Sequence, residues 1–90
     1  MELERLPGGD LVAKGLEDLA HSHETVEALL VSIAAPRLRN LGLPVAAPLS
    51  DPEHRLYARL AQEDSDSAHS RYNALLRRLA SFASALECVA

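Results

Sequence analysis

The segment from residue 67 to residue 88 constrains the fold most, because its apolar side chains recur at the spacing of an α-helix. Steps of three and four residues place these side chains on one helical face. They are Tyr72, Leu75, Leu76, Leu79, Phe82, Ala83 and Leu86. The opposite face carries small side chains interrupted by Arg77. We therefore predict a long amphipathic helix from about Ser67 to Cys88, with its apolar face buried against other helices.

The rest of the chain also favours helices over strands. Leucine supplies 17 residues and alanine 15, whereas the β-branched residues valine, isoleucine and threonine supply seven together. The 90 residues of the chain do not suffice for two ordinary domains of more than about 50 residues each. The sequence therefore predicts an all-α fold: a small antiparallel bundle of three or four helices with a proline-rich apolar linker, in a single domain over residues 1–90.

Residues 10–35 contain a second apolar stripe, which keeps one helical phase throughout. Its members are Val12, Leu16, Leu19, His23, Val26, Leu30 and Ile33. The unbroken phase favours one long bent helix, whereas the weak helix formers Ser22, His23 and Thr25 favour a break into two helices. Gly15 flanks the stripe, and we interpret it as a point where a neighbouring helix approaches closely.

Prolines and glycines mark where helices are interrupted. Residues 1–9 end in Pro7-Gly8-Gly9 and are expected to form an extended N-terminal arm. Pro36 disfavours helical geometry in the residue before it, so residues 37–41 are expected to form a separate short turn.

Candidate N-caps indicate where two helices begin. Asp10 is the expected N-cap of the first helix. Ser50 and Asp51 both offer caps for a helix that runs to about residue 63, and Glu53 is placed to complete a capping box.

Residues 43–50 form a proline-spaced linker that contains no charge, which is unusual for a connection on the surface. Its apolar side chains are Leu43, Val45 and Leu49. They either fold back onto the helices, the interpretation we favour, or contribute to an apolar patch that another subunit covers.

The charge is distributed unevenly. The chain has a formal net charge of −4, with seven acids against two bases in residues 1–35 and three arginines against one glutamate in residues 67–90. An acidic chain lacks an overall attraction for nucleic acid or anionic membranes. The opposed charges favour either a first and a last helix that lie side by side or head-to-tail contacts between chains.

Arg71, Arg77 and Arg78 are the candidate residues for contact with nucleic acid or with a protein partner. Three arginines neutralise few phosphates, and Tyr72 beside them belongs to the apolar face. Nucleic acid is therefore not the expected partner. A nucleic-acid-binding regulator, or an antitoxin-like dimer that doubles the basic last helix, is the first alternative function.

His21, His23 and Glu27 are the candidates for a polar site between subunits. On a helix the two histidines point about 200° apart, so one chain supplies at most half of a metal site. We interpret His23 as a hydrogen-bonded core or interface side chain and predict no metal and no other cofactor. A metal-dependent enzyme assembled between subunits is the second alternative function.

The sequence contains no motif that identifies a biochemical activity. Cys88 is the only cysteine, and we interpret it as a small packed side chain rather than a nucleophile. No serine or histidine stands in a catalytic context, so we predict no catalytic residue and no enzyme. A lone cysteine and the lack of a signal peptide or membrane span favour the cytoplasm.

A chain this small has a thin core. This chain also has a last helix with two packing faces, an uncharged linker and opposed charges at its two ends. These features favour association of copies. We therefore predict a non-enzymatic accessory or interaction protein that acts as a homo-oligomer of two or more chains, with scope for a further protein partner.

Overall fold

The chain folds into helices joined by turns and one longer linker. The computed structural model describes residues 3–89, and within them lie a 3-10 helix, η1, and five α-helices, without any strand. Their bounds are η1 Leu3–Arg5, α1 Gly9–Ala20, α2 Val26–Ile33, α3 Ala35–Asn40, α4 Pro52–Glu63 and α5 Ala68–Val89. The predicted all-α bundle is confirmed. The described residues contain five α-helices where three or four were predicted, because α3 was expected only as a turn.

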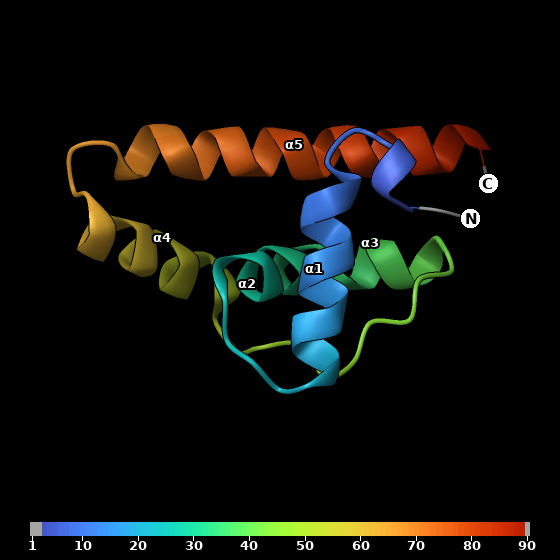
Figure 1. The fold of residues 1–90 in the computed structure, drawn as a ribbon, viewed down its shortest axis with the longest axis horizontal. Coiled ribbons are helices and arrows are strands. Elements are labelled where there is room, and N and C mark those ends of the chain that lie inside the picture. Colours follow the sequence, from blue (N-terminus) through green and yellow to red (C-terminus); the bar gives the residue numbers. More distant parts are fainter. Residues whose placement is uncertain (1–2, 90) are drawn as a thin grey trace.

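The long dimension of the molecule follows α5. Its 22 residues extend about 33 Å at the rise per residue of an α-helix, close to the 38 Å length of the molecule. Figure 1 shows α5 along one side, with α2, α3 and α4 below it and α1 running across α2. Leu79, Phe82 and Leu86 are buried, so the predicted helix and its apolar face are confirmed, with each end displaced by one residue.

The core is centred on α2, which has eight residues. The five residues from Ala28 to Ser32 are all buried, and α2 contacts α1, α4 and α5. An isolated helix of this length is marginal in water. The stability of α2 therefore comes from its burial among the other helices.

Gly15 marks the close approach of α1 to α2. A Cβ atom at this position would lie 2.5 Å from the Glu27 carbonyl oxygen and would also overlap the Val31 side chain. The sequence-based interpretation of Gly15 is thus confirmed: the neighbouring helix leaves no room for a side chain.

A single helix over residues 10–35 is wrong, because α1 and α2 are separate helices. Ser22 adopts a φ of 57°. The amide of Ser22 donates to the carbonyl of Leu19 at 3.1 Å, and the amide of His23 donates to that of Asp18 at 2.8 Å. This Schellman motif ends α1.

Thr25 then starts α2 as its N-cap. Its backbone is extended, and its Oγ1 accepts a hydrogen bond from the Ala28 amide at 3.0 Å. This bond satisfies one of the free amides of the first turn. The weak helix formers, and not the continuous apolar phase, therefore carried the correct signal.

The start of α1 also differs from the prediction. Residues 3–9 include η1 and a turn rather than an extended arm, and residues 1 and 2 of the predicted arm lie outside the described residues. The N-cap is Gly8, at a φ of 73° that favours glycine. Asp10, the predicted N-cap, lies in the first turn of α1 and forms an ion pair with Arg78 at 3.0 Å.

The linker folds back onto the helices, as favoured from the sequence. Val45 is buried, and Leu43 and Leu49 pack against the core. The Arg39 guanidinium donates to the Val45 carbonyl at 3.0 Å, and the Leu49 amide donates to the Ser32 hydroxyl at 3.0 Å. These bonds satisfy backbone groups in a segment without regular secondary structure.

The remaining boundaries are close to those predicted, but the capping box is wrong. Pro36 lies in the first turn of α3. The N-cap of α4 is Asp51, which has a φ of 46° and makes no side-chain cap bond. Ser50 is therefore not the N-cap, and the capping box that Glu53 would complete does not form. Arg55 donates instead to the Ser50 carbonyl at 3.1 Å, which fixes the entry into α4.

Candidate binding groove

A groove with a volume of about 550 Å³ opens between α1, the start of α2, α4 and α5. We call it the groove and define it by its lining residues. These are Leu11, Thr25, Val26, Glu27, Arg59, Glu63, Arg71, Ala74, Leu75 and Arg78. Apolar side chains thus share the groove with three arginines and two glutamates.

The apolar part of the groove consists mainly of Leu11 from α1, Val26 from α2 and Leu75 from α5. All three are half-buried and pack against the core. Ala74 is exposed beside them, and its small side chain leaves space open. Because core packing restricts the motion of such side chains, the groove has a preformed apolar floor.

Two of the groove arginines are paired one-to-one with acids. Arg71 lies 3.1 Å from Glu63, which links α5 to α4. Arg78 lies 3.0 Å from Asp10, which links α5 to α1. These side chains are about half exposed or more, so each pair stabilises the fold by no more than about 1 kcal/mol. Their main effect is to hold the guanidinium groups at the rim.

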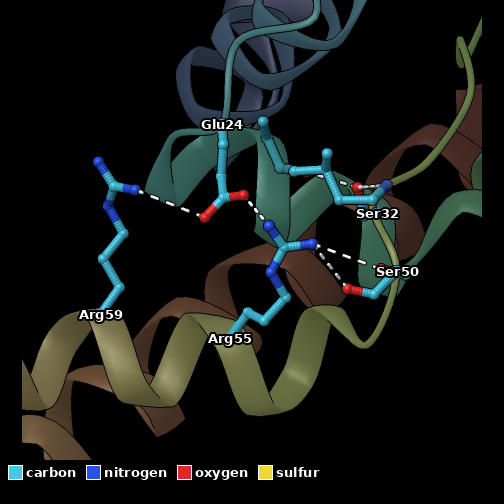
Figure 2. A network of polar contacts seen from close by, with 7 residues as sticks. Glu24, Ser32, Ser50, Arg55 and Arg59 are labelled. Carbon is cyan, nitrogen blue, oxygen red and sulfur yellow. Dashed lines mark hydrogen bonds and ion pairs between the residues drawn. The ribbon is translucent and has the colours of Figure 1, made fainter.

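Arg59 belongs to a different arrangement. Figure 2 shows Glu24, from the connection between α1 and α2, lying between Arg55 and Arg59 of α4. Arg55 donates a hydrogen bond to one oxygen of the Glu24 carboxylate. Arg59 lies 3.9 Å from the other oxygen. One carboxylate is therefore shared by two guanidinium groups.

The start of α2, which supplies three groove residues, is fixed by a polar cluster. Asp18 accepts hydrogen bonds from the Lys14 ammonium at 2.8 Å and from the Thr25 hydroxyl at 2.7 Å. The hydrogen bond from Lys14, followed by that from Thr25, holds the pKa of Asp18 below its ordinary value of 3.8. Lys14 also lies 3.9 Å from Glu27. The cluster ties this wall of the groove to α1.

The predicted basic residues are brought together only in part. Arg71 and Arg78 both line the groove, one helical heptad apart on α5. Arg77 is exposed and does not line it, and no ion pair of Arg77 is recorded within residues 3–89. Tyr72 packs edge-to-face against Tyr57 with ring centroids 5.5 Å apart. Burial, followed by the charge of Glu53, raises the pKa of Tyr72.

The histidines do not join Glu27 in a metal site within one chain. His21 and His23 are exposed in the connection after α1, with ring centroids 6.0 Å apart. The placement of His23 in the core is therefore wrong. Glu27 lies in the groove instead. The part of the chain that the structure describes contains no group of three His, Cys, Asp or Glu side chains able to hold a metal ion.

Cys88 is exposed near the end of α5, so its interpretation as a packed side chain is also wrong. The apolar side of α5 passes through residues 79, 82, 83 and 86, which are buried. Cys88 lies off that face.

Sequence reasoning missed the α4 side of the groove. Arg55, Arg59 and Glu63 recur at intervals of four residues, which places them along one helical face. That charged face was a readable signal. The position of this face opposite Glu24 and α5 depends on how α4 packs after the linker, and no local sequence pattern predicts that packing.

Comparison with protein-family models, with curated proteins and with solved structures finds no match to this chain. The fold and site themselves define the class: a small all-helical protein with an open, partly apolar groove rimmed by arginines and glutamates. Among the helices of residues 3–89, none has the length and apolar character needed to cross a membrane.

Proposed function

We propose that the chain is a non-enzymatic binding module that holds a ligand with an apolar body in the groove. The observation that carries this proposal is the combination of volume and lining. A volume of about 550 Å³ lies within the range of small-molecule sites, and such sites join an apolar surface to a few polar groups. Leu11, Val26 and Leu75 supply the surface, and the rim supplies the charges.

The polar groups of the groove are suited to recognition rather than to proton transfer. A guanidinium group donates hydrogen bonds and has no acceptor atom, so the groove arginines are suited to holding an anion. The two carboxylates of the groove each face a cation: Glu63 lies 3.1 Å from Arg71, and Glu27 lies 3.9 Å from Lys14. Paired carboxylates of this kind position a ligand by charge. This supports a binding protein over an enzyme.

Self-association remains part of the proposal, on narrower grounds than the sequence offered. One pair of the opposed charges, Asp10–Arg78, is engaged within the chain and joins α1 to α5. The linker is covered by the chain's own helices. The remaining support is the face of small side chains on α5, of which Ser70, Ser81 and Ser84 are exposed outside the groove and would allow a second copy to approach closely. We also propose a cytoplasmic location, supported by the lone cysteine.

Filling the groove tests its role. Ala74 and Ala80 are both exposed on α5, but only Ala74 lines the groove. We expect the neutral dye Nile red to bind the wild type with a blue-shifted emission. Ala74→Phe should weaken this binding by about tenfold, because the ring occupies the apolar floor. Ala80→Phe, the matched control, should bind the dye like the wild type.

Fluorescence titration measures both variants, and their thermal unfolding verifies that each is folded. Dye binding that Ala74→Phe leaves unchanged, or that both substitutions weaken equally, would show that the dye does not depend on the groove. No binding to the wild type would exclude the groove as a site for apolar ligands. Either result contradicts the proposed function.

A further inference from the structure

Among the three arginines that line the groove, only Arg59 has no acid of its own. Arg71 and Arg78 each have an acid of their own, Glu63 and Asp10. Arg59 shares Glu24 with Arg55, and Arg55 holds the hydrogen bond. Two guanidinium groups against one carboxylate leave one positive charge without a matching acid, and it lies at the groove.

The Arg59 guanidinium also retains unused hydrogen-bond donors. Its 3.9 Å separation from the Glu24 oxygen exceeds the length of a hydrogen bond. No hydrogen bond from its side chain to another residue is recorded within residues 3–89. The side chain is 42% exposed, so a ligand can reach it. A planar guanidinium with free donors binds a carboxylate or a similar oxyanion through two parallel bonds.

Arg59 stands beside the apolar floor rather than on an isolated polar surface. It lines the groove together with Val26 and Leu75, and it also lines a smaller adjoining hollow of about 210 Å³ beside Glu24 and Arg55. An anionic group at Arg59 would therefore place an attached apolar body over the floor. The two halves of an amphipathic ligand would both find complementary surface.

The size and charge of the groove further limit the class of ligand that it can bind. Its α5 wall runs from Arg71 to Arg78, which spans about 10 Å of helix and suits a small molecule better than a helix of several turns. The lining contains three arginines and two glutamates, and Asp10 lies beside Arg78 just outside it, so Arg59 is the one arginine of the lining available to a ligand anion. The glutamates repel a second negative charge, so the lining favours a monoanion.

We propose that the groove binds an organic monoanion with an apolar body and that Arg59 anchors its anionic group. This inference rests on the proposed function, and it assigns Arg59 as the residue that determines preference for the anion. Displacement of Glu24 is not required, because Glu24 keeps its hydrogen bond to Arg55.

A matched series of eight-carbon ligands tests the assignment by isothermal titration calorimetry. Octanoate carries the apolar body and one negative charge, octanol carries the body alone, octylamine carries the body with a positive charge, and acetate carries the charge alone. We expect octanoate to bind about tenfold more tightly than octanol, because a charge-assisted hydrogen bond to Arg59 typically adds about this much affinity. Octylamine and acetate should bind more weakly than octanoate.

Arg59→Gln should reduce the affinity for octanoate to that for octanol and leave octanol binding unchanged. Arg59→Lys retains the charge without the paired donors and should keep part of the preference. Arg77→Gln is the control, because Arg77 is an exposed arginine outside the groove. Thermal unfolding of each variant checks that the fold is intact.

Equal affinity for octanoate and octanol in the wild type would overturn the inference, as would a preference that survives in Arg59→Gln. If Nile red still requires an open position 74, the binding function stands and only the anion assignment fails. If Nile red does not use the groove, the proposed function fails first.

Discussion

Replacement of Phe82 by alanine is expected to lower the free energy of unfolding by about 3–5 kcal/mol. The ring is fully buried and is the largest side chain of the core. The turn before α1 lies against it, since a Cβ atom at Gly8 would be 3.4 Å from the Phe82 Cβ. Because α5 contacts α1, α2 and α4, the surrounding structure relaxes only partly around the cavity. Small domains are stable by about 5–15 kcal/mol, so the variant loses a large share of the total.

Urea unfolding followed by circular dichroism measures this effect. Val89→Ala is the control, because Val89 lies on the same helix with 58% of its surface exposed, and it should stay within about 0.5 kcal/mol of the wild type. A Phe82→Ala variant as stable as the control would contradict the described packing of α5.

Gly15→Ala is expected to destabilise the protein by about 1–3 kcal/mol, as overpacking does. The sign of the change is the informative result. In an open helix position the same substitution stabilises by about 0.5–1 kcal/mol, because alanine is the better helix former. At Gly15 the added methyl group meets the Glu27 carbonyl and the Val31 side chain. Contact between α1 and α2 therefore outweighs helix propensity.

A double-mutant cycle isolates the cause. Val31→Ala removes one of the two groups that the new methyl group meets, so Gly15→Ala should be less destabilising in that background than in the wild type. Thermal unfolding of the four proteins gives the coupling. A Gly15→Ala variant more stable than the wild type would show that α1 and α2 lie further apart than described.

Much of the fold was predictable because local patterns specify helices. The spacing of apolar residues located α5, and the uncharged linker correctly indicated a segment that folds back. The sequence left open whether residues 10–35 form one helix or two, because the apolar stripes of α1 and α2 happen to continue in one helical phase. A Schellman turn at Ser22 and a cap at Thr25 override that phase. The predicted cap at Asp10 failed because Gly8, two residues earlier, takes a left-handed conformation and is the N-cap.

The candidate site was predictable only along single helices. Arg71, Arg77 and Arg78 were singled out as the basic residues of the last helix, and two of them, Arg71 and Arg78, line the groove. Arg59 could not be found in the same way. Its importance comes from Glu24, which lies 35 positions earlier in the chain and is brought beside α4 by the packing of α2. Contacts of that kind follow from tertiary structure and produce no periodic pattern in the sequence.

Methyl NMR during a titration with octanoate locates the bound ligand and so tests most directly whether the groove is a binding site. We predict progressive chemical-shift changes at Leu11, Val26 and Leu75, which line the groove. The methyl groups of Val89, exposed elsewhere on α5, should not change. Shifts concentrated at Val89, or spread evenly over the exposed apolar residues, would contradict a binding function for the groove.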